Sequence, residues 1–303
     1  ADDAYYGQHL QREEEPAFQI AVYDMDLALG RELRAAVTMD LEGPALSAYP
    51  FTMYHGYQVT RVIDENGAAL PFTREGDYLT VTPAGPLSSL TVEYAGSSPM
   101  FYSGSQGACL PGCFPYYPWA GYRKIFYGQP GDETRLLAFI PRTDLPESEF
   151  AVKITGGKNV QVSLPESDGA YRGRANGLSL MGGLLEAREL GPYRLVTSPL
   201  APPGYQATKE WLDQLQTAVT QEEERQGLSP VIQLSDYVLF QDSETLLNRA
   251  GYGLALVFSD HMFLRFGWDA DSLAEEIVSQ YYGPVNLSGE AELAELERQA
   301  MGQ

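Results

Sequence analysis

The sequence predicts a β-rich α+β fold, in which an N-terminal antiparallel β-sandwich is followed by a smaller mixed α/β region. Short strand-like segments follow one another through the first 200 residues without intervening helices, which is typical of antiparallel sheets. The composition agrees, because 20 Tyr, 30 Gly and 20 Pro favour strands and turns over a helical bundle. Beyond residue 205 the apolar residues recur with the period of amphipathic helices.

The first region, residues 1–200, is expected to form a sandwich domain of two packed sheets. Its segments alternate apolar and polar residues at the spacing expected of such a fold. Asn66 and Gly67 follow the third predicted strand, and an Asn-Gly pair at this place predicts a hairpin to the fourth. The predicted strands are 17–29, 33–42, 58–64, 70–74, 78–82, 90–94, 136–140, 150–155, 160–164, 177–181 and 193–197.

Pro199–Gly204 interrupts this pattern and is the predicted boundary to a second domain, residues 205–303. Thr208 can cap a helix that runs to Gln226, with one apolar stripe and Gly227 as its end. The remaining elements predicted in this domain are strands over 231–240 and 252–258, a helix capped by Asp271 or Ser272 that runs to Tyr282, and a helix over 288–301.

The net charge of the 303 residues is -21, which disfavours binding to nucleic acid and to anionic lipid. No window approaches the ~18 apolar residues that a membrane helix needs. Solubility is one explanation of the charge, and recruitment of a cationic partner is the other. The acidic runs 13–15 and 222–224 are expected to be solvated.

Cys109 and Cys113 are the two cysteines of the chain, and Leu110-Pro-Gly lies between them. A turn at Pro111 and Gly112 could bring the two sulfurs together, so a local disulfide is predicted. Such a bond indicates an oxidising, extracytoplasmic setting. The alternative is a pair of free thiols.

The segment Leu273–Gly283 is the most informative part of the sequence. As a helix it places Glu275 and Ser279 one turn apart on one face, with Glu276 beside them. Histidines at positions 275 and 279 would make it the zinc helix of a metallopeptidase, in which two imidazoles hold the metal and the Glu is the base. A carboxylate and a hydroxyl are poor substitutes for that pair.

The order of these parts resembles the zinc aminopeptidase N family of gluzincins, and more closely the version found as the extracytoplasmic domain of bacterial ABC-transporter-type permeases. The segments that carry the resemblance are 49–62 with the turn after it, 90–96, 110–119 and 273–283. The resemblance implies a first domain like the N-terminal domain of these aminopeptidases. It implies a second domain like the front part of a thermolysin-type catalytic domain.

The departures from that family predict a domain without aminopeptidase activity, zinc or any other cofactor. The third zinc ligand of the family would fall on Arg298, with Glu297 one place short. The strand that grips the substrate N-terminus has no clear counterpart, because 251–255 lacks its Glu. Glu276 keeps the position of the general base, but such a base needs a metal-bound water to act on.

The resulting expectation is an extracytoplasmic binding or coupling domain, tethered to the membrane as part of a transport permease. Its partners would be a peptide or protein, held between the two domains, and the membrane-embedded part of the same polypeptide or a transporter. One alternative is an active metallo-aminopeptidase whose metal is held by other residues.

A second alternative is a carbohydrate-binding module that uses the aromatic residues of 114–127. In that case Tyr116, Tyr117, Trp119 and Tyr122 would form the ligand surface. Packing of a long loop on the domain body is the competing explanation. A catalytic triad of Ser259, Asp260 and His261 is not expected, because adjacent residues cannot all face one point.

Overall fold

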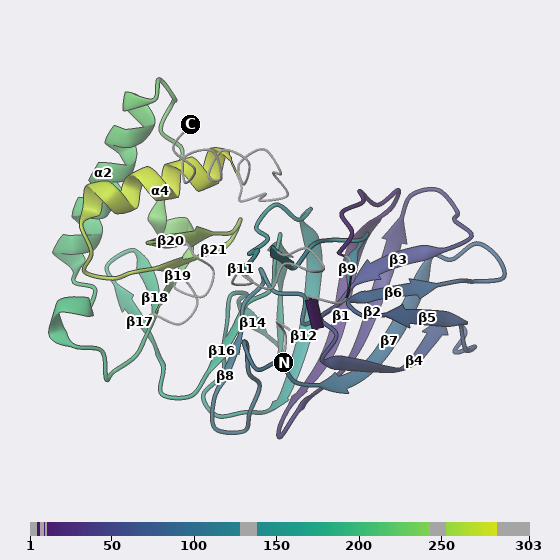
Figure 1. The fold of residues 1–303 in the computed structure, drawn as a ribbon. Coiled ribbons are helices and arrows are strands. Elements are labelled where there is room, and N and C mark those ends of the chain that lie inside the picture. Colours follow the sequence, from purple (N-terminus) through teal and green to yellow (C-terminus); the bar gives the residue numbers. More distant parts are fainter. Residues whose placement is uncertain (1–4, 7–8, 10, 128–137, 243–252, 284–303) are drawn as a thin grey trace.

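A computed structural model gives the structure of residues 5–6, 9, 11–127, 138–242 and 253–283. A β-sandwich forms one part of the molecule, and a five-stranded sheet covered by two helices forms the other (Figure 1). The predicted β-rich α+β fold is confirmed. No helix in these residues is long and apolar enough to cross a membrane.

The larger layer of the sandwich is a seven-stranded sheet. Its strands, in spatial order, are β14 (Glu166–Ser167), β15 (Ala170–Ala175), β12 (Ser148–Gly156), β1 (Gln19–Leu29), β2 (Leu33–Glu42), β7 (Ser89–Gly96) and β4 (Tyr57–Asp64). Its pairs are antiparallel except β1 and β12, which run parallel. The prediction of a purely antiparallel region was wrong at this pair.

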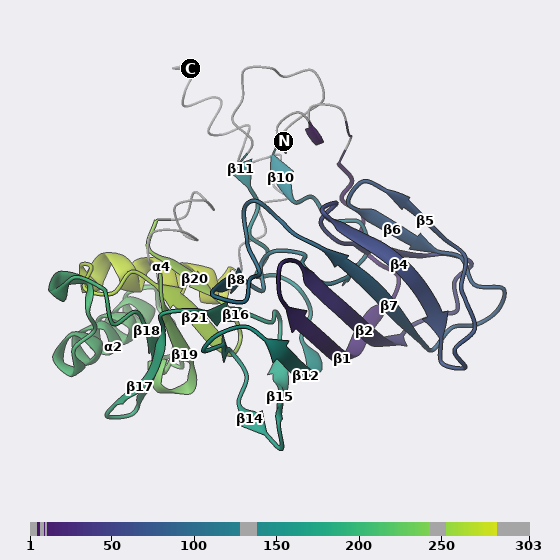
Figure 2. The ribbon, with the colours of Figure 1, turned by 90° about the horizontal axis from the view of Figure 1, so that it is seen from below.

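The second layer is a four-stranded sheet that consists of β5 (Phe72–Glu75), β6 (Tyr78–Val81), β3 (Tyr49–Thr52) and β9 (Trp119–Ala120). Its strands β5 and β6 are seen beside the larger sheet in Figure 2. The buried residues of the two sheets belong to one hydrophobic core. Two small sheets complete this part of the molecule. They consist of β13 (Gln161–Val162), β16 (Leu180–Gly182) and β8 (Ala108–Leu110), and of β10 (Phe126–Tyr127) and β11 (Ala138–Phe139).

The alternation seen in the sequence explains the sandwich core. In β1, Met25 and Leu27 are buried, whereas Asp24 and Asp26 are exposed on the other face, as a period of two residues requires. Burying apolar surface contributes about 25 cal/mol per Å², so the side chains of this one face stabilise the packing of the two layers.

The predicted turn at Gly67 forms, but the hairpin is incomplete. Gly67 has a φ of +80° and donates a 3.0 Å backbone hydrogen bond to Asp64, and Leu70 returns one to Val62. The chain then leaves β4, and β5 pairs with β6 in the other layer. The turn residues therefore specify the local reversal, whereas β5 joins the other sheet, where Phe72 packs against the core.

The other part of the molecule is a mixed five-stranded sheet with α2 and α4 on one face (Figure 1). Its elements are β17 (Glu186–Leu190), β18 (Tyr193–Thr197), β19 (Val238–Gln241), β21 (His261–Leu264) and β20 (Ala255–Val257), with α2 (Lys209–Arg225), α4 (Ala270–Tyr282) and the short 3-10 helices Pro203–Tyr205 and Leu234–Asp236. The predicted cap of α2 is confirmed, since Thr208 accepts a hydrogen bond from the backbone of Trp211.

Several element predictions in this part need correction. Residues 193–197 were expected in the sandwich, but β18 pairs with β19, so the predicted boundary at 199–204 lies between two strands of one sheet. Only the end of 231–240 is a strand, and β21 was missed. Asp269, rather than Asp271 or Ser272, caps α4 because its carboxylate accepts from Ser272 N. Residues 136–137 and the predicted helix over 288–301 lie outside the described residues.

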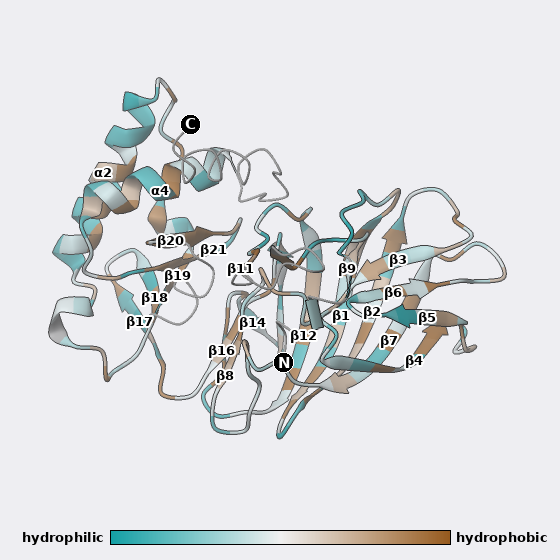
Figure 3. Ribbon diagram, viewed as in Figure 1, coloured by the Kyte–Doolittle hydropathy of each residue, from teal (hydrophilic) through white to brown (hydrophobic). Residues whose placement is uncertain are grey.

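The five-stranded sheet shares its core with the sandwich. Alternate residues of β18 to β21 point to opposite faces, and buried apolar residues lie on both faces. Much of the ribbon of β19 to β21 has the colour of hydrophobic residues (Figure 3). The residues on the sandwich side are Val196, Phe240, Leu256, Phe258 and Phe263. The residues below α2 and α4 are Leu195, Leu239, Val257, Met262 and Leu264. Along these strands the space between the two predicted domains, where the sequence predicted a peptide or protein partner, is therefore filled by buried side chains.

The acidic run 13–15 is not simply solvated. Glu13 accepts hydrogen bonds from Arg142 Nη1 at 2.9 and 3.0 Å and from Arg123 Nη1 at 3.2 Å. Both arginines are buried, at 1% and 4% exposure, so the carboxylates of this segment neutralise charges inside the protein. Glu223 is likewise buried, and it accepts from Tyr282 Oη at 2.8 Å.

Candidate functional site

Helix α4 carries the three residues predicted from the degenerate zinc motif. Its buried face is Leu273, Ala274, Ile277, Val278 and Gln280, which packs on the five-stranded sheet. Glu275 and Ser279 are exposed on the opposite side, as the one-turn spacing predicted. Glu275 has a cation nearby, because Arg225 Nη2 lies 4.0 Å from its carboxylate.

Glu276 lies between the exposed and buried faces and points toward the start of β20. One carboxylate oxygen, Oε2, accepts the backbone N–H of Leu254 at 2.9 Å, and Oε1 accepts Gln280 Nε2 at 3.1 Å. Burial raises the pKa of Glu276 above its ordinary value, while these hydrogen bonds and Arg265 act in the opposite direction. Both oxygens of the predicted general base are therefore bonded to the protein itself.

Gln280 completes the contact between α4 and β20. Its Oε1 accepts the backbone N–H of Val257 at 3.0 Å, and its Nε2 donates to the carbonyl oxygen of Ala255 at 2.9 Å. Among the residues that the structure describes, β20 is an edge strand of this sheet and pairs only with β21. The amide of Gln280 thus satisfies the free side of that edge as the peptide group of an added strand would.

These donors do not fit zinc. Structural and catalytic zinc sites are built from imidazole, thiolate and carboxylate ligands at close to 2 Å. Position 279 supplies a hydroxyl, position 275 an exposed carboxylate, and the oxygens of Glu276 are engaged elsewhere. Within the described ranges, no three His, Cys, Asp or Glu side chains lie close enough together to hold a metal ion. Positions 297 and 298, where the family's third ligand would fall, and residues 251–252 lie outside the described residues.

The imidazoles of His55 and His261 bond carboxylates rather than lying near the motif residues on α4. His55 Nδ1 lies 3.0 Å from Asp77 Oδ1, and its ring stacks on Tyr5. His261 Nδ1 lies 2.6 Å from Asp260 Oδ1, and its Nε2 lies 2.7 Å from the hydroxyl of Ser179. Both histidines thus belong to polar clusters away from α4.

Asp260, His261 and a serine hydroxyl contact one another in the order of a catalytic triad, but the cluster is not accessible to a substrate. The sequence offered Ser259 as the hydroxyl, whereas the structure brings in Ser179, which is 82 positions away in the chain. Ser179 and His261 are both 0% exposed, so no substrate reaches them. Ser179 also accepts the backbone N–H of Gly112, and Ser259 exchanges two hydrogen bonds with Asn176. This cluster therefore joins the sandwich to the turn between β20 and β21.

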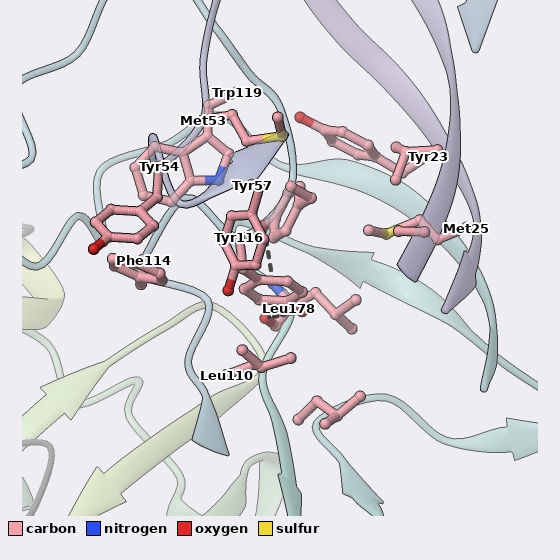
Figure 4. Close-up of a cluster of buried hydrophobic side chains, with 14 of the residues drawn as sticks. Tyr23, Met25, Met53, Tyr54, Tyr57, Leu110, Phe114, Tyr116, Trp119 and Leu178 are labelled. Atoms are coloured by element: carbon pink, nitrogen blue, oxygen red, sulfur yellow. Dashed lines mark hydrogen bonds between the residues drawn. The ribbon is translucent and has the colours of Figure 1, made fainter. Parts of the chain in front are cut away.

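Three of the four residues of the predicted ligand surface, Tyr116, Tyr117 and Trp119, are buried. They are at most 1% exposed, and Figure 4 shows Tyr116 and Trp119 inside a cluster with Phe114 and Leu178. Tyr116 donates from its hydroxyl to Leu178 O at 2.9 Å. Tyr122 is partly exposed, and its hydroxyl bonds Thr80. Packing of the loop, the competing explanation, is the correct one.

The predicted disulfide is not formed. Cys109 and Cys113 are both buried thiols. Cys109 lies in β8, where it pairs with Met181 of β16, and Cys113 follows the turn at Pro111. Burial raises the pKa of the Cys113 thiol well above its ordinary value, which disfavours the thiolate that oxidation requires.

No protein-family model matches the sequence, and no curated protein does either. Solved structures show a similar fold. An M1 zinc metallopeptidase from Deinococcus radiodurans is 16% identical with a TM-score of 0.52, and the match covers 85% of this chain and 61% of that one. A mutant two-domain M1 zinc metallopeptidase bound to L-arginine is also 16% identical, with a TM-score of 0.56 and coverage of 91% and 67%.

Native leukotriene A4 hydrolase from Saccharomyces cerevisiae is a third similar structure. It is 14% identical with a TM-score of 0.51, and the match covers 82% of this chain and 40% of that one. The chain spans about three fifths of the length of the Deinococcus radiodurans structures. The chain therefore has a peptidase-like fold, that of M1 zinc metallopeptidases.

Proposed function

We propose that this chain is a peptidase-like binding or coupling domain without aminopeptidase activity. The observation that carries the proposal is the use of Glu276 and Gln280 by the protein itself. Their side chains bond the backbone of Leu254, Ala255 and Val257. The helix that would hold a catalytic metal therefore serves to anchor an edge strand, and its two ligand positions carry Glu275 and Ser279.

We further propose an extracytoplasmic location, with the domain attached to a membrane transport permease of the ABC type. This part extends the resemblance of the sequence to the aminopeptidase N family, in the version attached to such permeases, which segments 49–62, 90–96, 110–119 and 273–283 carry. The peptidase-like fold agrees with it. In this role a protein or peptide partner, rather than a substrate, would contact the domain.

The test of the first proposal measures zinc and peptidase activity together. The protein, purified without added metal, is analysed by elemental mass spectrometry and assayed with fluorogenic amino-acid amides. We expect less than one zinc for ten chains, roughly the level of adventitious binding, and no hydrolysis. Stoichiometric zinc, with hydrolysis that is lost in Glu276→Gln, would overturn the proposal.

A variant that restores the missing ligands gives a matched control. The double substitution Glu275→His and Ser279→His places two imidazoles one turn apart on the exposed side of α4. We expect it to bind Zn²⁺ at least about ten times more tightly than the natural chain, because two neutral imidazoles replace a hydroxyl and an exposed carboxylate. Equal zinc affinity of both proteins would show that positions 275 and 279 are not what prevents metal binding.

A further inference from the structure

We propose that a groove between α2 and the start of α4 binds a cationic segment of a partner protein, with a Lys or Arg side chain placed against its two tryptophans. The groove has a volume of about 620 Å³. That is within the range of sites for drug-sized ligands, and large enough for one or two side chains of a peptide. The inference names a surface for the binding role proposed above and rests on that role.

Tryptophan forms the apolar part of the groove. Trp211 and Trp268 are two of the three Trp in the chain, and both line it. Trp211 is fixed in place, because its Nε1 donates to the carbonyl oxygen of Trp268 at 2.9 Å and its ring packs on Phe266. The walls of the binding surface are thus already organised without a ligand.

Trp268 has the properties of a cation-binding ring. The guanidinium of Arg265 lies 5.8 Å from its ring centroid, so this tryptophan already attracts a cation of its own chain. It nevertheless remains 42% exposed, which is unusual for so large an apolar side chain. The exposed part of the ring is available to a second cation.

The charges around the groove are complementary to a basic ligand. Asp213, Asp269 and Asp271 line it, and no Lys or Arg is among the described residues that do. Asp213 is paired with Lys209 at 2.6 Å, and Asp269 caps α4. Asp271 is exposed and forms no ion pair with the described residues, so it remains available to a partner. The net charge of -21 would steer a basic segment toward the protein.

The wall formed by α2 offers hydrogen bonds to a peptide backbone. Gln214, Thr217 and Gln221 line the groove on one face of the helix, as their spacing of three and four residues requires. The two glutamines are exposed, and each amide supplies both a donor and an acceptor. A peptide segment, rather than an isolated amine, uses all of these groups together.

The experiment is a calorimetric titration with a defined probe at 0.15 M salt. The probe is a ten-residue acetylated and amidated peptide with four Lys among Ala and Leu, and the control peptide carries Glu in place of Lys. We expect only the Lys peptide to bind. Trp268→Ala and Asp271→Asn should each raise its Kd by about two- to fivefold, the range of an exposed cation–aromatic or charge contact.

Matched variants separate the groove from general charge attraction. Asp24→Asn removes an exposed charge from β1, and Tyr102→Ala removes an exposed ring from the sandwich. We expect both to bind the Lys peptide as the natural chain does. Equal weakening by Asp24→Asn and Asp271→Asn, an unchanged Kd for Trp268→Ala, or no binding at all would overturn the inference. Those results leave the zinc and hydrolysis measurements unaffected, so failure of the groove and failure of the proposed function are distinguishable.

Discussion

Gln280 on α4 and Val257 on β20 are joined by a 3.0 Å hydrogen bond in which a side-chain amide takes the place of a neighbouring strand. The same amide donates to Ala255 O, so one side chain satisfies two backbone groups of an edge strand. Gln280 is 5% exposed. Since water cannot replace these bonds readily, Gln280 is a structural residue of the helix-to-sheet contact.

Gln280→Leu should destabilise the protein by roughly 2–4 kcal/mol, because a buried donor and a buried acceptor both lose their partner. Urea unfolding followed by circular dichroism measures the change. The control is Ser279→Ala, one position away on the exposed side of α4, which should stay within about 0.5 kcal/mol. Equal effects of the two substitutions would contradict the role assigned to Gln280.

Glu276 should give the stability a specific pH dependence. Burial raises the pKa of Glu276 in the folded protein above its ordinary value of 4.5. As the pH rises past 4.5, this carboxyl group therefore ionises in the unfolded chain at a lower pH than in the folded protein. The unfolding free energy of the natural chain should therefore fall relative to that of Glu276→Gln as pH rises through this window, and then level off. Urea titrations from pH 4 to 8 measure the difference. Ser279→Ala, which changes no titrating group, should run parallel to the natural chain, and a flat difference for Glu276→Gln would refute the prediction.

Glu13→Ala should be among the most destabilising changes to an acidic residue. The substitution removes the Glu13 carboxylate that balances the charges of the buried Arg142 and Arg123. Removing one partner of a buried ion pair typically costs about 3–5 kcal/mol. Glu14→Ala is the matched control, because the neighbouring side chain is exposed and should change stability by less than about 0.5 kcal/mol. Thermal and urea unfolding both report the difference. Similar stabilities of the two variants would mean that the arginines find other partners.

Cys109 and Cys113 should both react with a thiol reagent after unfolding. In guanidinium without reductant we expect two reactive thiols per chain, and in the native state only slow reaction, since both side chains are buried. Mass spectrometry after alkylation counts them. A protein from which no thiol can be titrated under denaturing conditions would establish the disulfide that the sequence suggested.

The sequence was sufficient for the parts of the fold that depend on local patterns. The alternation of β1, the Thr208 cap and the amphipathic face of α4 each follow from residues within a few positions of one another. The partner of a strand is a long-range property, and there prediction failed. β18 belongs to the five-stranded sheet, in which Val196 pairs with Phe240 of β19, more than 40 positions away in the chain.

The same limit applies to the candidate site. The exposed positions of Glu275 and Ser279 followed from helical spacing, but the engagement of Glu276 with Leu254 joins two elements and could not be read from the motif. Ser179 was missed because no local signal connects it to His261. Gln280 lies on the same helix as Glu276, but its bonds to Ala255 and Val257 also join two elements. The aromatic loop was ambiguous, since stacking on a ligand and packing in a core use the same residue types.

The sheet shared by the two predicted domains determines what happens if the chain is divided at the Pro-rich segment. A fragment ending at residue 200 would keep β17 and β18 but lose β19, the parallel neighbour of β18. The remaining fragment would keep β19, β21 and β20 but lose β17 and β18 from the same sheet. Each fragment would expose an unpaired strand edge and apolar side chains that are buried in the whole protein. Fragments for expression or crystallisation should therefore not be cut there. Any movement of one half of the molecule relative to the other would have to rearrange the core that they share.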